Sequence, residues 1–350
     1  MNPSLTIGRH RIGPGEPVYL VAEISANHKQ KFEQALLLLQ AAKEAGADAV
    51  KLQTYTPNTL TIPSNREFFR VGGGTLWDGR TLYDLYRAAY TPWEWQPRLK
   101  EAAEELGLAF FSTAFDPSAV DFLEGMGVPV HKVASFEIVD IPLVEKMAGT
   151  GKPLILSTGM ATLQEIEEAL RAARKGGAEE IALLKCNSAY PAPPEEMNLR
   201  AIPHLAETFG VPVGLSDHTL GISVPVAAVA LGACIVEKHF ILSRSDGGPD
   251  SAFSVEPHEF KAMVQAIRIA EKALGEVRLG LNPSEEKSKI FRRSLFVVQD
   301  VKAGETFTDE NVRSIRPGMG LHPRHLKEIL GRAARKDVER GTPLAWEHVG

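Results

Sequence analysis

Short apolar runs alternate with longer amphipathic segments through most of the chain. In the longer segments the apolar positions recur every three or four residues and the segment closes at glycine, as in FEQALLLLQAAKEAGA and LQEIEEALRAARKGGA. This spacing predicts helices with one buried face. The short runs have the length and composition of buried strands. They cover residues 18–25, 49–55, 109–115, 130–137, 153–160, 181–190, 212–218 and 234–240.

The alternation of eight strands with helices predicts an α/β fold in which a parallel sheet is covered by helices. Eight such units within about 260 residues match a closed (β/α)8 TIM barrel, which we expect to fill residues 1–275. The alternative is a doubly wound open sheet. No Gly-rich GxGxxG turn follows the first strand, and this weakens the alternative.

The pattern changes after residue 275. Residues 276–290 are polar and rich in turn formers, which predicts a linker. Residues 291–350 contain short strand-like pieces broken by Gly and Pro, which predicts a second, smaller domain. A domain of about 60 residues has a thin core, so we expect it to lean on another surface.

Composition narrows the classes of partner. The chain has 350 residues and a net charge of −5, without a dense run of Lys or Arg, so neither a nucleic acid nor a polybasic membrane contact is expected. The N-terminus lacks an apolar signal core, and no window approaches the roughly 18 apolar residues of a membrane span. We therefore expect a cytoplasmic protein. Its two cysteines, Cys186 and Cys234, lie inside apolar runs and are expected to be buried thiols.

Polar or ionisable residues end every predicted strand, and a closed barrel gathers these ends around one mouth. Several Lys with several Ser and Thr, and no Asp-rich cage, suit a multiply charged anion. The sequence therefore predicts a phosphorylated or carboxylated substrate. The residues at these ends include Glu23, Lys51, Gln53, Thr113, Lys132, Ser135, Ser157, Lys185, Ser188, Tyr190, Ser216 and Glu237.

Two histidines close the last two predicted strands, His218 in GLSDH and His239 in VEKHF. Neutral imidazoles from adjacent strands can converge on a divalent ion and leave positions open for substrate oxygen and water. Buried apolar runs also commonly end in a hydrogen-bonded core histidine. The spacing alone leaves both interpretations open.

A family resemblance is carried by several segments in the same order along residues 17–349. The chain resembles the sialic acid synthase family in VAEISANH, GADAVKLQTYTPNTLT, FFSTAFD, HKVASFEIVDIPLVEKMAGTGKPLILSTGMAT, YPAPPEEMNL, GLSDHTLG, VEKHF and GGPDSAFS. The tail, with VVQDVKAGETFTDENVRSIRPGMGL, resembles the antifreeze-like (SAF, β-clip) domain that follows the barrel in this family. The resemblance implies condensation of phosphoenolpyruvate with an acetamido-sugar aldehyde to give a nonulosonic acid.

Within the family, the segments GGTLWDGRTLYDLYRAAYTPWEW, KCNSAYPAP and DSAFSVEPHEFKAMV are most similar to the branch that makes pseudaminic acid. Three of the four Trp and three of the six Tyr lie between residues 77 and 95. These aromatic side chains either pack a long loop or form a partly apolar lid, which would suit a 6-deoxy, doubly acetamido sugar. The alternatives within the family are N-acetylneuraminate and legionaminate synthases.

The resemblance assigns roles residue by residue. It implies that His218 and His239 hold a divalent metal, Mn²⁺ or else Mg²⁺ or Co²⁺, with water and substrate oxygen completing the shell. Proton transfer in this reaction needs a carboxylate near the site, for which we expect Glu23 first and Glu237 second, although both could instead be ion-pair partners of nearby lysines. Phosphoenolpyruvate contacts fall on Lys51, Thr113, Lys132, Ser135, Ser157 and Ser216, and sugar contacts on Glu23, Gln53, Ser188, Tyr190 and Asp250.

Two further positions bear on the sugar and on assembly. Residue 188 is Ser where the acetylneuraminate synthases have Asn, which leaves the identity of the sugar open. Arg316 in RPGMG matches an arginine that reaches into the partner subunit's mouth, which implies a domain-swapped homodimer.

The sequence leaves two functions from other classes as alternatives. A barrel hydrolase would use the His pair to activate water. An ice-binding protein would need a flat, fairly apolar face, whereas RSIRPGMGLHPRHLKE is heavily charged.

Overall fold

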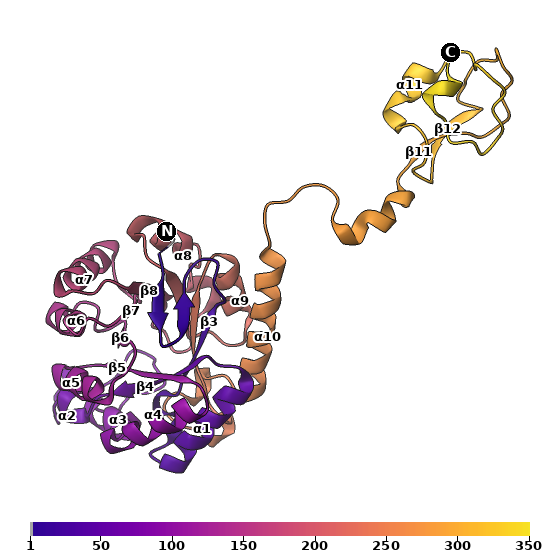
Figure 1. Ribbon diagram of the computed structural model, residues 1–350. Helices are drawn as coiled ribbons and strands as arrows, with labels where there is room; N and C mark the ends of the chain where they lie inside the picture. Colours follow the sequence, from indigo (N-terminus) through magenta and orange to yellow (C-terminus); the bar gives the residue numbers. More distant parts are fainter. Residues whose placement is uncertain (1–2) are drawn as a thin grey trace. The chain divides into compact units, whose positions relative to one another are not determined.

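The protein folds into two compact units, the first ending at Gly275 and the second formed by Glu276–Gly350 (Figure 1). This computed structural model describes residues 3–350. Eight parallel strands close into a barrel in the first unit, and every one lies inside a predicted run. The TIM barrel predicted from the sequence is therefore confirmed, and the alternative prediction of a doubly wound open sheet is wrong. The strands are β3 (Tyr19–Glu23), β4 (Ala49–Thr54), β5 (Ala109–Ala114), β6 (His131–Val133), β7 (Leu154–Ser157), β8 (Ile181–Cys186), β9 (Val213–Asp217) and β10 (Ile235–His239).

Helices follow each strand and cover the outside of the barrel (Figure 1). Their ends carry the expected stop and start signals. Helix α7 begins with a reciprocal cap between Thr162 and Glu165 and ends at Gly177, whose φ of 109° suits glycine. The covering helices are α1 (Phe32–Ala45), α4 (Gln96–Glu105), α5 (Pro117–Met126), α6 (Ile141–Ala148), α7 (Leu163–Gly176), α8 (Ala201–Phe209), α9 (Ser223–Ala230) and α10 (Pro257–Leu274).

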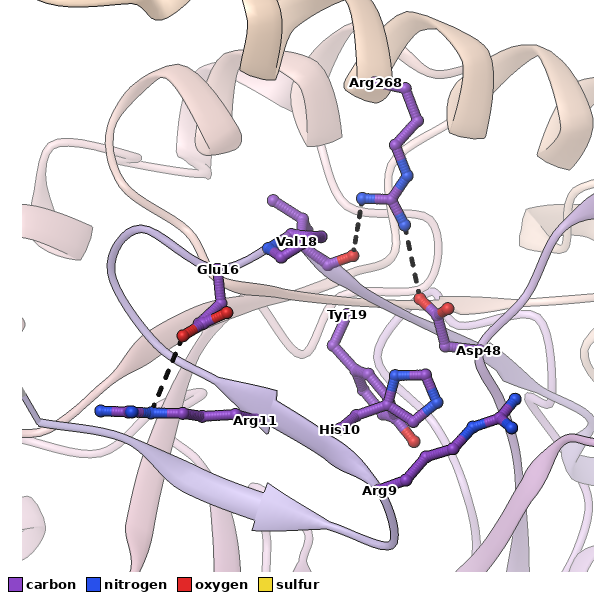
Figure 2. A pocket seen from close by; sticks show the side chains of 9 residues that line it. Arg9, His10, Arg11, Glu16, Val18, Tyr19, Asp48 and Arg268 are labelled. Carbon is purple, nitrogen blue, oxygen red and sulfur yellow. Dashed lines mark hydrogen bonds and ion pairs between the residues drawn. The ribbon is translucent and has the colours of Figure 1, made fainter.

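A short hairpin closes the N-terminal end of the barrel. Its strands are β1 (Leu5–Ile7) and β2 (His10–Ile12), and Figure 2 shows them beside Tyr19 at the start of β3. The side chains of Leu5, Ile7 and Ile12 are fully buried and join the cluster that fills the barrel interior. The hairpin was not predicted, because three-residue strands are too short to show a two-residue alternation.

A long insertion separates β4 from α4. It contains α2 (Pro57–Leu60), α3 (Leu82–Ala89) and two 3₁₀ turns, η2 (Glu67–Phe69) and η3 (Trp93–Trp95). Two of its tryptophans pack the insertion onto the helices around the barrel, as expected if these aromatic residues pack a long loop: Trp93 lies tilted against Phe122, and Trp95 packs edge-on against Phe32. Trp77 is different, because it reaches the barrel mouth.

The second unit has its own small core. Leu295, Val297, Phe307, Val312 and Ile329 are at most 1% exposed and pack together. Its elements are η7 (Pro283–Phe291), β11 (Ser294–Val297), β12 (Val312–Ile315), η8 (Pro323–His325), α11 (Leu326–Ile329) and η9 (Trp346–His348).

The remaining 3₁₀ turns belong to the barrel mouth. They are η1 (Ser25–His28), η4 (Pro194–Glu196), η5 (Arg244–Asp246) and η6 (Ser251–Phe253). Within residues 3–350, no helix combines the length and the apolar character needed to cross a membrane.

Candidate active site

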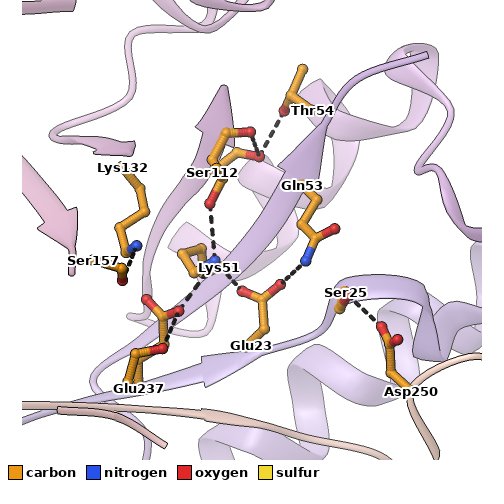
Figure 3. Close-up of polar contacts among 12 residues, drawn as sticks. Glu23, Ser25, Lys51, Gln53, Thr54, Ser112, Lys132, Ser157, Glu237 and Asp250 are labelled. Atoms are coloured by element: carbon orange, nitrogen blue, oxygen red, sulfur yellow. Dashed lines mark hydrogen bonds and ion pairs between the residues drawn. The ribbon is translucent and has the colours of Figure 1, made fainter. Parts of the chain in front are cut away.

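The C-terminal ends of the barrel strands bring most of the predicted site residues together at one mouth. Glu23 ends β3, Lys51 and Gln53 lie on the adjacent β4, and Glu237 lies on β10, which pairs with β3 to close the barrel. Figure 3 shows the side chains of Glu23, Gln53 and Glu237 gathered around the Lys51 ammonium. Neighbouring parallel strands place these residues in register, so the cluster follows from the barrel closure itself.

Lys51 is the centre of this cluster. Its Nζ lies 2.6 Å from Glu23 Oε2 and 3.4 Å from Glu237 Oε1, and it donates a 3.0 Å hydrogen bond to Thr113 Oγ1. Gln53 Nε2 donates to the other Glu23 oxygen at 3.1 Å. Glu23 is 1% exposed and Lys51 is 3% exposed, so little water screens these charges.

The two carboxyl groups differ in their proton affinity. Burial raises the pKa of Glu23 to about 7, with Glu237 adding to the effect and Lys51 opposing it. Burial alone would also raise the pKa of Glu237, but Lys51 and Lys132 outweigh burial and lower it. Glu23 is thus able to exchange a proton near neutral pH while Glu237 stays ionised. Such a divergence is typical of acid and base partners in active sites.

A second buried ammonium belongs to Lys132 on β6. Its Nζ donates to Ser157 Oγ at 2.6 Å and to the Val133 carbonyl oxygen at 2.9 Å. Burial lowers its pKa from the usual value, and Glu237 opposes that effect. Lys51 and Lys132 thus place two cations and several hydroxyls at one mouth, an arrangement that suits a phosphate or carboxylate group.

Three predicted serines lie at the same mouth. Ser216 Oγ donates to Glu237 Oε1 at 3.5 Å, which is a weak bond at this length. Ser135 Oγ accepts from the Gly159 amide at 3.1 Å. A Cβ at position 159 would lie 2.3 Å from Ser188 Oγ and 2.7 Å from Ser135 Oγ. Gly159 therefore allows the two loops to approach, a role that the sequence reasoning missed.

His218 is oriented by its neighbours. Its Nδ1 lies 2.7 Å from the Asn187 carbonyl oxygen. A carbonyl only accepts, so Nδ1 carries the proton of this bond and Nε2 keeps a lone pair when the ring is neutral. A carbonyl partner of this kind commonly orients metal-binding histidines.

His239 lies beside it, with the two ring centroids 5.3 Å apart. Its Nδ1 is buried and has no hydrogen-bond partner among the described residues. Burial lowers its pKa well below the usual value, and His218 adds to the effect, so the ring stays neutral. His239 therefore fits the role of a metal ligand. Burial lowers the pKa of His218, but Cys186 outweighs burial and raises it, so His218 fits this role in its neutral form. In the described part of the chain, no group of three or more His, Cys, Asp and Glu side chains has metal-binding geometry.

An ion pair that sequence reasoning did not assign holds these two histidines in place. Asp217 precedes His218, Lys238 precedes His239, and both side chains are fully buried and form an ion pair with each other. Lys238 also donates to the Thr219 carbonyl oxygen at 2.7 Å. Because successive side chains of a strand point to opposite faces, this pair locks β9 to β10 from the side away from the histidines.

Tyr190, one of the residues predicted to bind the sugar, lies next to both histidines. The Tyr190 ring centroid is 4.3 Å from that of His218 and 5.7 Å from that of Trp77. Trp77 Nε1 donates to the Pro249 carbonyl oxygen at 3.0 Å, which ties the insertion to the loop after β10. Asp250 Oδ2 in that loop accepts from the Ser25 hydroxyl at 2.5 Å.

Two of the residues predicted to bind the sugar, Ser188 and Arg316, make no hydrogen bond or ring contact with the other described residues of the mouth. The Ser188 hydroxyl is buried and has no hydrogen-bond partner among the described residues. Arg316 lies directly after β12 in the second unit and is exposed. The structure thus gathers the predicted barrel residues, while Arg316 belongs to a separate unit.

Family models match both units. A model described as the NeuB family matches residues 38–278, and a model described as the SAF domain matches residues 292–350. The chain is 48% identical over 335 residues to the pseudaminic acid synthase of Helicobacter pylori, covering 95% of this chain and 98% of the relative. It is 38% identical over 344 residues to the N,N'-diacetyllegionaminic acid synthase of Legionella pneumophila, covering 96% of each.

Solved structures agree with the family models. The N-acetylneuraminic acid (sialic acid) synthetase of Leptospira borgpetersenii superposes with a TM-score of 0.73 at 33% identity, covering 82% of this chain and 95% of that chain. The spore coat polysaccharide biosynthesis protein SpsE of Bacillus subtilis gives a TM-score of 0.67 at 32% identity and covers 99% of both chains.

Proposed function

Because the chain belongs to the NeuB family, we propose that it condenses phosphoenolpyruvate with an open-chain N-acetylated amino sugar and water to give a nonulosonic acid and phosphate. The resemblance to sialic acid synthases found in the sequence is thereby confirmed. We assign it as a pseudaminic acid synthase. Identity of 48% to such an enzyme, against 38% to a legionaminic acid synthase, supports this choice of sugar.

One observation carries the chemistry: two buried lysines face a buried pair of carboxyl groups with opposite pKa shifts. Lys51 and Lys132 supply the charge for the phosphate and carboxylate of phosphoenolpyruvate. The proposed contacts to phosphoenolpyruvate are completed by the hydroxyl groups of Thr113, Ser135, Ser157 and Ser216. We assign sugar binding to the part of the barrel mouth next to the histidines, which is formed by Gln53, Ser188, Tyr190 and Asp250.

His218 and His239 are the residues that would hold a divalent metal, with Mn²⁺ proposed first and Mg²⁺ or Co²⁺ as alternatives. Burial keeps His239 neutral, and the Asn187 carbonyl holds a proton on Nδ1 of His218, so Nε2 of His218 can bind such an ion when that ring is neutral. When bound, the ion supplies Lewis acidity at the aldehyde oxygen of the sugar. The Tyr190 ring packs against that of His218 at an angle of 42°, with centroids 4.3 Å apart, and limits the movement of the imidazole.

The carbon–carbon bond forms when C3 of phosphoenolpyruvate attacks the aldehyde carbon. Glu23, with a pKa of about 7, is our first choice to give the developing alkoxide its proton. Water then adds at C2, and we assign Glu237, which stays ionised, to accept the proton released. The tetrahedral centre collapses to the ketone as its hydroxyl proton leaves with the phosphate, and we assign Lys132 and Ser157, which are bonded to each other, to hold that phosphate.

We further propose that two chains pair by exchanging their SAF domains, so that Arg316 of one chain contacts the sugar bound by the other. The exposure of Arg316 leaves it accessible for this role. We also propose that the protein acts in the cytoplasm. Its two cysteines are buried free thiols, as is usual in a reducing compartment.

A coupled phosphate-release assay tests the function. The purified enzyme is given phosphoenolpyruvate with the 2,4-diacetamido altrose derivative, its legionaminic counterpart or N-acetylmannosamine, and we expect the first to turn over fastest. Turnover of N-acetylmannosamine alone would replace the pseudaminic assignment. An arm without sugar separates the metal-dependent hydrolase, because a hydrolase would release phosphate from phosphoenolpyruvate by itself.

A further inference from the structure

A second cavity of about 200 Å³ lies at the opposite end of the barrel from the active site. The hairpin contributes Arg9, His10 and Arg11, and α10 contributes Arg268. Tyr19 begins β3 and Asp48 directly precedes β4, so the cavity lies at the starts of the strands whose other ends carry Glu23 and Lys51. None of the sequence motifs assigned a role to these residues.

Part of the lining is already engaged, because Arg268 donates to the Val18 carbonyl oxygen at 3.0 Å and to Glu271 Oε1 at 2.8 Å, whereas Arg9 and Arg11 are exposed. Asp48 is engaged, because its Oδ2 accepts from the Leu20 amide at 2.9 Å and lies 3.5 Å from Arg268 Nη2. Arg11 makes only a loose contact, with its Nε 3.8 Å from Glu16 Oε1. Arg9 forms no ion pair with any residue between 3 and 350. A free guanidinium in a polar cavity is suited to a carboxylate or phosphate oxygen.

Tyr19 provides an independent indication of a ligand. Its side chain is 2% exposed, yet its hydroxyl has no hydrogen-bond partner among the described residues. Its ring packs edge-on to that of His10 with centroids 5.4 Å apart, and Figure 2 shows the hydroxyl end extending toward the hairpin residues. A buried hydroxyl without a partner carries a desolvation cost that an acceptor on a ligand would relieve.

We propose that this cavity, defined by Arg9, His10, Arg11, Tyr19 and Arg268, binds a small anion through a carboxylate or phosphate group. Arg9 supplies a two-pronged contact, the Tyr19 hydroxyl donates a further hydrogen bond, and Arg11 and Arg268 add positive charge at the rim. The volume of about 200 Å³ is below that of most ligand pockets, so it suits a small anion or the anionic group of a larger molecule. Phosphate, phosphoenolpyruvate and the nonulosonic acid product share the required chemistry.

Isothermal titration of the full chain with each of these three anions tests the proposal and distinguishes the sources. A Lys132→Met background weakens binding at the active site, so that the remaining binding reports on the cavity. In this background we expect Arg9→Ala and Tyr19→Phe each to weaken binding of the preferred anion by about tenfold. Arg171→Ala, an exposed arginine on α7, serves as the matched control and is expected to change nothing.

Tyr19→Phe is the decisive variant, because the hydroxyl makes no internal hydrogen bond and its loss removes no bond from the fold. The number of bound anions per wild-type chain provides a second measurement that does not need Lys132→Met. We expect two in the wild-type chain and in Tyr19→Phe, with the affinity of the second site about tenfold lower in Tyr19→Phe. A single site in the wild-type chain, or equal affinities in Tyr19→Phe and Arg171→Ala, would overturn the proposal. Neither measurement requires turnover, so the proposal stands or fails separately from the proposed function.

Discussion

The Lys51 ammonium lies 2.6 Å from a Glu23 carboxylate oxygen, and both side chains are almost completely buried. The same ammonium lies 3.4 Å from Glu237. A single cation therefore keeps two acidic side chains close together in a site that excludes water. Removing one partner of such a buried group is costly, because the remaining charges lose their compensation.

Lys51→Met is expected to abolish phosphate release and to lower the free energy of unfolding by about 3–5 kcal/mol, because two buried carboxyl groups then face each other. Urea denaturation measures the stability. The double variant Lys51→Met with Glu23→Gln should recover part of the lost stability, since only one carboxylate then remains uncompensated. Additive losses in the double variant would contradict the proposed coupling.

Stability should depend on pH through Glu23. Its pKa is raised to about 7 in the folded protein, so between about pH 4.5 and 7 the native chain keeps a proton that the unfolded chain has lost. The free energy of unfolding therefore falls as pH rises through this window, by up to about 3 kcal/mol. Denaturation of metal-free protein at several pH values measures the effect. Glu23→Gln should show a smaller fall, because burial also raises the pKa of Glu137 to about 7 and that group is unchanged; an identical pH profile in both proteins would count against the raised pKa of Glu23.

Removal of either histidine is expected to abolish product formation without unfolding the barrel. His239→Ala and His218→Ala should lose at least a thousandfold in kcat/KM, because the aldehyde oxygen loses its Lewis acid. Chelation of the wild-type enzyme should have the same effect and be reversed by Mn²⁺. Circular dichroism reports the fold, and His204→Ala, an exposed position on α8, is the control. Full activity of metal-free enzyme would refute the metal assignment.

Trp77→Ala should raise the KM for the acetamido sugar by about tenfold and leave the KM for phosphoenolpyruvate unchanged. The indole packs on Tyr190 and bonds to the loop that carries Asp250, so its loss opens the sugar side of the mouth. Steady-state kinetics with each substrate varied separately measures both constants. Trp93→Phe changes an aromatic residue that packs against Phe122 and should leave both constants unchanged. Equal rises in both KM values after Trp77→Ala would argue against a specific sugar contact.

Complementation between inactive chains tests the exchange of SAF domains. Arg316→Ala and His239→Ala should each be inactive alone. Chains of the two kinds that are produced together should regain about a quarter of the wild-type activity, because one site of each mixed dimer has an intact barrel and an intact arginine. Separately purified variants, mixed without exchange, provide the control. Absence of any recovery in verified mixed dimers would place Arg316 in its own chain's site.

The barrel could be predicted because its strands are buried on both faces and therefore read as continuous apolar runs. β9 and β10 illustrate this, since VPVGLSDH and ACIVEKHF each run from apolar residues into polar ones at the mouth. The hairpin β1–β2 escaped prediction, because its strands have three residues each and their burial depends on the barrel end they cover.

The residue types of the site could be predicted, but their interactions could not. The clustering of Lys51 with Glu23 and Glu237 arises from the pairing of β10 with β3, residues more than two hundred positions apart. The buried pair Asp217–Lys238 looked like two more polar strand ends in the sequence. The need for glycine at position 159 depends on the approach of Ser135 and Ser188 from two other loops.

The hairpin at the N-terminal end blocks that end of the barrel, because Leu5, Ile7 and Ile12 are buried in its interior. Among the described residues, the buried Lys51 and Glu23 are therefore reached from the C-terminal mouth, beside Trp77 and Tyr190. The proposed substrates and products share this one route, so a change of Trp77 or Tyr190 affects entry and release together.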